Sequence, residues 1–184
     1  MINSINSRTR LERLFSNMKF KALFLVALSS MLYLSGCGKD AELEKYNEEM
    51  TTFTENISDI KLRMDDIDPN SEDAVSDILE CLDELETQFN ALADMEVPKD
   101  FSSIESLADE AGSYMTEAVS LYHEVFEASE YDEATADVAA QNYDRAMMRL
   151  SYISTLLQGE LPEGDNIIIT EEEALDFEPV TDVE

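Results

Sequence analysis

Residues 43–67 read LEKYNEEMTTFTENISDIKLRMDDI, with an apolar residue at every third or fourth position. This spacing places the apolar side chains on one face of a single helix, which would be about 36 Å long at 1.5 Å per residue. The stripe consists of Leu43, Tyr46, Met50, Phe53, Ile57, Ile60, Met64 and Ile67. A helix alone in water cannot bury such a stripe. The stretch therefore predicts a long helix that packs against partners of similar length.

The ends of this helix carry recognisable signals. Asp40 is a suitable N-cap, and Glu42 and Glu44 are placed favourably for the positive end of the helix dipole. Pro69 disfavours helix at the residue before it, and Ser71 is a suitable N-cap for a second helix. We therefore expect a break at 68–71.

Two further stripes follow along the chain. The second helix carries Val75, Ile78, Leu82, Leu85, Phe89 and Leu92, and a break over residues 95–100, which contains Pro98, separates it from the third. The third stripe is wider, which indicates contact with more neighbours. It consists of Ile104, Leu107, Ala111, Tyr114, Ala118, Leu121, Val125 and Ala128, flanked by Ala108, Met115 and Tyr122.

A turn is expected near residues 129–132, although neither proline nor glycine marks it, and a single helix running through this region is the alternative. The fourth stripe is Ala136, Ala139, Tyr143, Ala146, Leu150, Ile153 and Leu157, and Gly159 supplies a helix stop. Four stripes joined by short breaks predict an all-α domain over residues 40–159, an antiparallel, up-down-up-down four-helix bundle. The alanines should let the third and fourth helices approach closely, with Phe53 and Phe89 filling the space opposite.

Residues 160–184 differ from the bundle. They are acidic, contain two prolines and hold one apolar cluster, residues 167–169. This composition favours a mostly disordered tail. Docking of the cluster on the bundle is the alternative.

The amino-terminal part has the pattern of an export signal. A 13-residue apolar run, 22–34, follows Lys19 and Lys21; it is too short for a membrane span of about 20 residues but suits a secretory segment of about 7–15. The run ends in Leu34-Ser35-Gly36-Cys37, which resembles the lipobox of bacterial lipoproteins. The resemblance implies that Cys37 receives a diacylglyceryl lipid and that residues 1–36 are removed. Residues 37–39 would then form a short tether, and Met18 is an alternative start. An uncleaved hydrophobic segment is the competing interpretation.

The balance of acidic and basic residues limits the partners that the chain can bind. Without residues 1–36, the remaining 148 residues hold 7 basic and 41 acidic side chains, a net charge near −34. This balance excludes the usual mode of nucleic-acid binding and argues against adhesion to anionic headgroups. The lipid would hold the chain on the extracytoplasmic side of the bacterial cell membrane. With Cys37 lipidated, Cys81 has no disulfide partner and is predicted to be a small core residue.

The residues indicate no enzyme and no cofactor. His123 is the single histidine, and Ser120 stands where a di-iron bundle would need glutamate. No phosphate-binding loop, dinucleotide-binding motif or nucleophile elbow occurs. His123 is interpreted as a solvated residue at the flank of its helix, and a metal pair with Glu127 is the weaker alternative.

Acidic residues gather at two of the predicted turns. In an alternating bundle these turns share the end far from the lipid, and we call their ten carboxylates the acidic pole. They are Asp65, Asp66, Asp68, Glu72, Asp73, Glu127, Glu130, Asp132, Glu133 and Asp137. The residues expected to bind a partner are Asp65, Asp66, Asp68, Glu72, Asp73, Glu130, Asp132 and Glu133.

Within the pole, the spacing of Asp66, Asp68, Asn70 and Asp77 partly matches a calcium-binding EF-hand loop. Ser71 occupies the position that requires glycine, and Asp77 replaces the bidentate glutamate. Any Ca²⁺ site there would be weak.

The favoured interpretation is a lipid-anchored, non-enzymatic binding or accessory module that engages a basic protein or divalent cations through the acidic pole. The alternative is a structural spacer of the envelope with no specific ligand.

Overall fold

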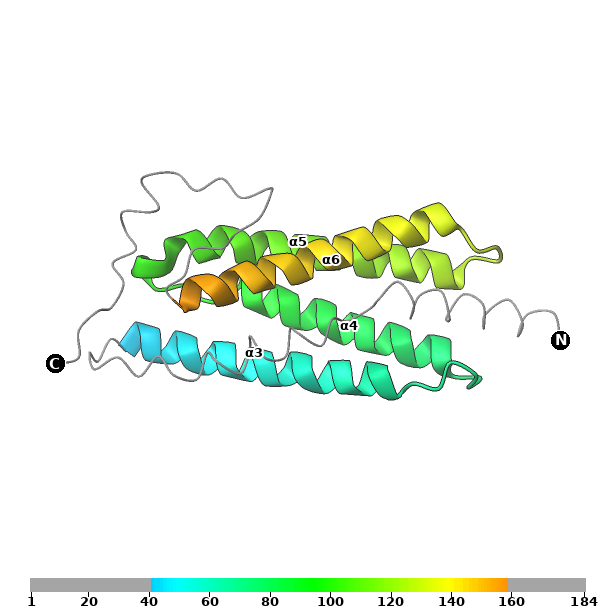
Figure 1. Ribbon diagram of the computed structural model, residues 1–184, viewed down its shortest axis with the longest axis horizontal. Coiled ribbons are helices and arrows are strands. Elements are labelled where there is room, and N and C mark those ends of the chain that lie inside the picture. Colours follow the sequence, from blue (N-terminus) through cyan, green and yellow to red (C-terminus); the bar gives the residue numbers. More distant parts are fainter. Residues whose placement is uncertain (1–40, 159–184) are drawn as a thin grey trace.

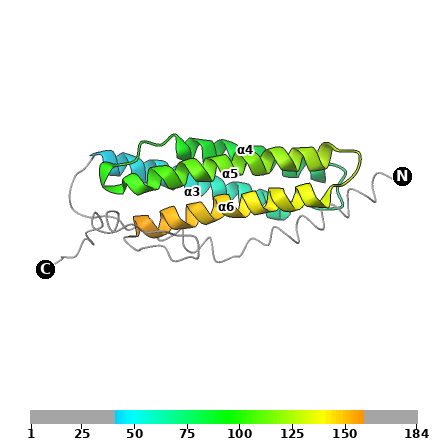
Figure 2. The ribbon, with the colours of Figure 1, turned by 90° about the horizontal axis from the view of Figure 1, so that it is seen from above.

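The computed structural model describes residues 41–158 (Figure 1). The predictions for the signal peptide, for Cys37 and its tether, for Asp40, for Gly159 and for the 160–184 tail concern residues outside this range. Four helices are present in the described part: α3 (Ala41–Asp66), α4 (Ala74–Ala93), α5 (Ser102–Glu127) and α6 (Glu133–Leu157). A 3₁₀ turn, η2 (Lys99–Phe101), precedes α5. The helices alternate in direction, and the predicted antiparallel four-helix bundle is confirmed (Figures 1 and 2).

The stripes of α3 and α6 are buried much as the sequence predicts. Six of the eight positions of the first stripe are buried; Leu43, near the start of α3, and Ile67, the first residue after it, are half-buried. Every predicted position of α6 is buried. In α4 the stripe is confirmed except at Val75, which is half-buried, and Cys81 joins the core with 4% of its surface exposed.

The buried face of α5 differs from the prediction by a small rotation. Leu107, Tyr114 and Leu121 are half-buried and Ala128 is exposed, whereas the predicted flank residues are fully buried, together with Gly112, Val119 and Phe126. The reason is that α5 packs closely against both α4 and α6. Its buried face is therefore centred between these two neighbours, which the periodicity of α5 alone does not locate.

Small residues bring three of the helices close together. The backbones of α5 and α6 approach each other over the longest stretch, as the alanines predict. A Cβ atom added at Gly112 of α5 would lie 3.3 Å from the carbonyl oxygen of Phe89 and 3.4 Å from the Cβ of Ala93, which both belong to α4. Gly112 thus allows a close approach to α4, although it lowers the helix propensity of α5 by about 1 kcal/mol relative to alanine.

Helix α3 stands further from its neighbours. Its close backbone approaches are mainly to α4 and are fewer than those between α4 and α5. Large buried side chains bridge the space: the rings of Phe53 and Phe89 meet edge to face, with centroids 5.8 Å apart and planes at 77°. Figure 2 shows α4 and α5 side by side, with α6 along the other side of α5.

The breaks confirm the predicted turn near residues 129–132 and correct the predicted N-cap of the second helix. Helix α4 begins at Ala74 with Asp73 as N-cap, and not directly after Ser71; the Ser71 hydroxyl instead accepts a hydrogen bond from the Asp73 backbone N–H at 3.2 Å. The alternative of one helix through residues 129–132 is wrong, because Ala128 is extended and Asp132 caps a new helix. None of the described helices is long and apolar enough to cross a membrane.

Candidate functional site

The two acidic turns lie at the same end of the bundle. Figure 1 shows the α3–α4 and α5–α6 connections together at the right-hand end, and the first residues of α3 at the opposite end. All ten carboxylate residues of the acidic pole are exposed. The alternation of helices therefore brings together residues that are up to 72 positions apart in the sequence, Asp65 and Asp137.

Several of these carboxylates already have roles within the fold. Asp65 forms an ion pair with Lys61, with 2.6 Å between Oδ2 and Nζ. Asp132 accepts hydrogen bonds from the backbone N–H groups of Ala134 and Thr135 and from the Thr135 hydroxyl, and these bonds lower the pKa of Asp132 below its usual value. A partner that bound Asp132 would compete with the N-cap of α6.

Asp68 is also engaged locally. Its Oδ1 accepts hydrogen bonds from the backbone N–H and the side-chain amide of Asn70, both at 2.9 Å. The side-chain amide of Asn70 thus points its donor group, and not its oxygen, at Asp68. Among the described residues no group of three or more His, Cys, Asp or Glu side chains is arranged to hold a metal ion. The geometry therefore gives no support to the predicted cation site at Asp66, Asp68, Asn70 and Asp77.

Five other residues of the acidic pole have no lysine or arginine partner among the described residues. Within residues 41–158, no ion pair with lysine or arginine is formed by Asp66, Glu72, Asp73, Glu130 or Asp137. The arginines of the described part interact outside this set: Arg63, in the last turn of α3, binds Glu84 on α4. Arg149 binds Glu110 with 2.6 Å between Nε and Oε2, and it lies over the ring of Tyr114, as does Arg145. The pole therefore keeps most of its negative charge.

His123 connects two helices, which corrects its interpretation as a solvated flank residue. Its Nε2 lies 2.7 Å from Oδ1 of Asp83 on α4, and its Nδ1 lies 3.3 Å from Oε1 of Glu127 one turn along α5. The hydrogen bond with Asp83, and next that with Glu127, raise the pKa of His123, while partial burial opposes them. The spacing to Glu127 was visible in the sequence, but Asp83 is 40 residues away and only the packing of α4 on α5 identifies it.

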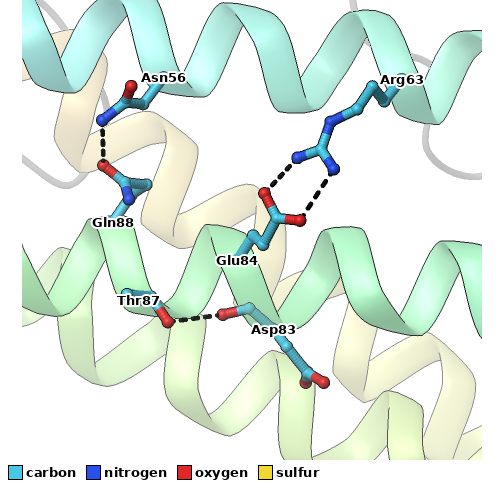
Figure 3. Close-up of polar contacts among 6 residues, drawn as sticks. All are labelled: Asn56, Arg63, Asp83, Glu84, Thr87 and Gln88. Carbon is cyan, nitrogen blue, oxygen red and sulfur yellow. Dashed lines mark hydrogen bonds and ion pairs between the residues drawn. The ribbon is translucent and has the colours of Figure 1, made fainter.

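Polar side chains link α3 to α4 along the outside of the bundle. Figure 3 shows Arg63 holding both carboxylate oxygens of Glu84, and the Asn56 amide donating to Oε1 of Gln88 at 2.9 Å. The Arg63 hydrogen bond lowers the pKa of Glu84. Nearer the start of α3, Lys45 lies 3.4 Å from a carboxylate oxygen of Glu96. No local sequence pattern marks these residues, because their partners are 21 to 51 positions away.

An open groove of about 620 Å³ runs between α3 and α4, and we call it the α3–α4 groove. Its lining is acidic and polar at the rim and contains three apolar residues, Phe53, Ala91 and Met95. The remaining lining residues are Lys45, Glu48, Glu49, Thr52, Asn56, Gln88, Asp94 and Glu96. The groove follows from the wide spacing of α3, whose large and polar side chains keep the two backbones apart.

Two surfaces of the described residues thus suit binding, the acidic pole through its charge and the α3–α4 groove through its shape and charge together. The chain matches no known family model, no curated protein and no solved structure.

Proposed function

We propose that this chain is a lipid-anchored, non-enzymatic binding module on the extracytoplasmic face of a bacterial membrane. The anchor is inferred from Leu34-Ser35-Gly36-Cys37 and from the short apolar run before it. Helix α3 begins four residues after Cys37. Its 26 residues extend about 39 Å, so the acidic pole would face away from the membrane.

The observation that carries the binding role is the concentration of uncompensated carboxylates at this pole. Arg63 and Arg149 each bind a carboxylate that is not part of the pole, whereas five acids of the pole have no lysine or arginine partner among the described residues. Such a surface attracts positively charged partners over roughly a Debye length, about 8 Å at physiological ionic strength. We therefore infer that the partner is a protein with a basic surface. The proposal assigns no catalytic residue and no cofactor.

The anchor is tested by replacing Cys37 with serine and expressing both proteins in the native host. We expect the wild-type protein to enter the detergent phase with a lipidated amino-terminal cysteine, identified by mass spectrometry. The Cys37→Ser variant should keep its leader and lose the lipid. Recovery of an unmodified Cys37 with an intact leader from the wild-type protein would refute the anchor.

The role of the pole is tested with two triple variants of equal charge. Asp66→Asn, Asp73→Asn and Glu130→Gln neutralise the pole and spare the Asp132 cap and the Asp68 turn. The matched control neutralises three exposed acids nearer the opposite end, through substitutions Glu44→Gln, Glu105→Gln and Asp109→Asn. Each protein is crosslinked in intact cells of the host, and its adducts are compared. Loss of adducts in the pole variant alone supports the proposal. Identical adduct patterns in the wild-type protein and both variants would favour the alternative of a structural spacer with no specific ligand.

A further inference from the structure

We propose that the α3–α4 groove is a binding site for a linear organic amine, of the diamine or polyamine class. The site lies on the half of the bundle that holds the start of α3, away from the acidic pole. It depends neither on the lipid anchor nor on a protein partner at the pole, and it can be tested apart from both.

The groove has the shape of a site for an extended small molecule. Its lining runs along α3 from Lys45 to Asn56, which is about 16 Å at 1.5 Å per residue, and along α4 from Gln88 to the residues just after the helix. Its volume of about 620 Å³ lies within the range of roughly 300–1,000 Å³ that is usual for small-molecule sites. An extended chain fits such a groove better than a compact ring does.

The charges of the groove select a cation. Four carboxylates line it, those of Glu48, Glu49, Asp94 and Glu96, against one base, Lys45. All four belong to the end near Lys45, two on the α3 side and two on the α4 side. An anion would be repelled there. A bare metal ion is not favoured, because the carboxylates are not grouped as ligands within the described residues.

Lys45 itself shows which cation the site accepts. Its ammonium lies 3.8 Å from Oε1 of Glu49 on α3 and 3.4 Å from Oε2 of Glu96 across the groove. A primary ammonium group of the chain is thus already held between carboxylates of both walls. Both contacts are long for direct ion pairs and the side chain of Lys45 is 57% exposed, so a ligand amine can displace it.

The middle of the groove suits the methylene groups of such a ligand. Beside the carboxylates lie the exposed methyl group of Ala91 and the half-buried Met95, which offer apolar surface, whereas the ring of Phe53 belongs to the buried core behind the lining. At the far end stands the amide pair of Asn56 and Gln88. This order of side chains would match a ligand with one amine between the carboxylates and three or four methylenes over the apolar residues. A second amine of the ligand would lie near the amides.

The test is a calorimetric titration of spermidine into the full chain purified in detergent, at 0.15 M NaCl. We expect saturable binding with one ligand per chain. Glu96→Gln and Asp94→Asn should each raise Kd at least about threefold, since each removes one charge contact. Lys45→Gln should lower Kd, because it removes the competing ammonium.

Two control variants separate the groove from the general charge of the protein. Glu105→Gln and Lys99→Gln make the same charge changes near the same end of the bundle but outside the groove. If they leave Kd unchanged while the groove variants shift it, the proposal holds. Equal shifts in groove and control variants would show counter-ion condensation only and would overturn the site, as would heats that never saturate up to millimolar spermidine. Melting curves of all variants confirm that each remains folded.

Discussion

The ring contact between Phe53 and Phe89 should be the main side-chain link that holds α3 on the rest of the bundle. Both rings are buried, with 1% and 0% of their surface exposed, and they meet edge to face at 5.8 Å. Since the backbone of α3 makes fewer close approaches than the other helices do, the stability of its docking depends on such large side chains. A double-mutant cycle with leucine at both positions measures this contact.

The expected magnitudes follow from the geometry. Replacing either ring by leucine keeps most of the apolar volume and should cost about 1–1.5 kcal/mol of unfolding free energy. An edge-to-face aromatic pair contributes about 0.5–1.5 kcal/mol beyond the area it buries. Each single variant loses this contribution, but the double variant loses it only once. The coupling energy should therefore be about 1 kcal/mol, and the double variant should be more stable than the sum of the single changes predicts.

The assay is urea unfolding followed by circular dichroism, with linear extrapolation to water. A control cycle pairs Phe53→Leu with Phe126→Leu, because Phe126 lies near the other end of the bundle, about 20 Å further along its axis. That pair should be additive within about 0.5 kcal/mol. A coupling energy below about 0.3 kcal/mol for Phe53 and Phe89, or one equal to that of the control, would refute the role assigned to the ring contact.

Three further predictions concern polar groups. Asp83 raises the pKa of His123 in the folded state, so their contact stabilises the protein fully below the unfolded pKa of about 6.5. This stabilisation is lost as the pH rises through the higher folded pKa. Asp83→Asn should therefore flatten the decline of the melting temperature with pH above 6.5. Asp132→Ala should lower the melting temperature at pH 7 by removing the α6 cap, while Asp132→Ser should retain most of the cap's stabilisation. The difference in melting temperature between wild type and Asp132→Ala should shrink as acid protonates Asp132, because the lowered folded pKa makes the charge-dependent part of this stability present above 3.8 and absent below the folded pKa. The hydroxyl of Tyr122 is buried without a hydrogen-bond partner among the described residues. Tyr122→Phe should therefore leave the unfolding free energy unchanged or raise it by about 1 kcal/mol in urea titrations. A loss of more than about 1 kcal/mol would show that the hydroxyl does form a stabilising hydrogen bond.

The fold was predictable because the apolar pattern repeats at one period over four segments. A stripe such as that of α6 requires a partner surface whatever its neighbours are, so the burial of Ala139, Tyr143 and Leu150 followed from spacing alone. The rotation of α5 did not follow. Whether Leu121 or Tyr122 points to the core depends on where α4 and α6 lie, and one helix does not contain that information.

The acidic pole could be predicted from the sequence, whereas the α3–α4 groove and the contact of His123 with Asp83 could not. The common location of the two acidic turns follows from the number and alternation of the helices, which the sequence supplies. The contact of His123 with Asp83 and the lining of the α3–α4 groove depend on which faces of two helices meet. Residues that are 40 or more positions apart, such as Lys45 and Glu96, give no local signal of their contact. Local patterns therefore located the pole and could not locate the groove.

Helix spacing explains why the groove lies between α3 and α4 and not elsewhere. Alanines on α5 and α6, and Gly112 opposite α4, let these backbones approach so closely that a single added Cβ atom would already touch Phe89 and Ala93. The partners of α3 are instead an aromatic pair in the core and long polar side chains outside it. Large side chains hold two helices at a distance, and part of the space between α3 and α4 remains open to solvent as the α3–α4 groove. The same residues that dock α3 therefore also create the space in which a ligand can bind.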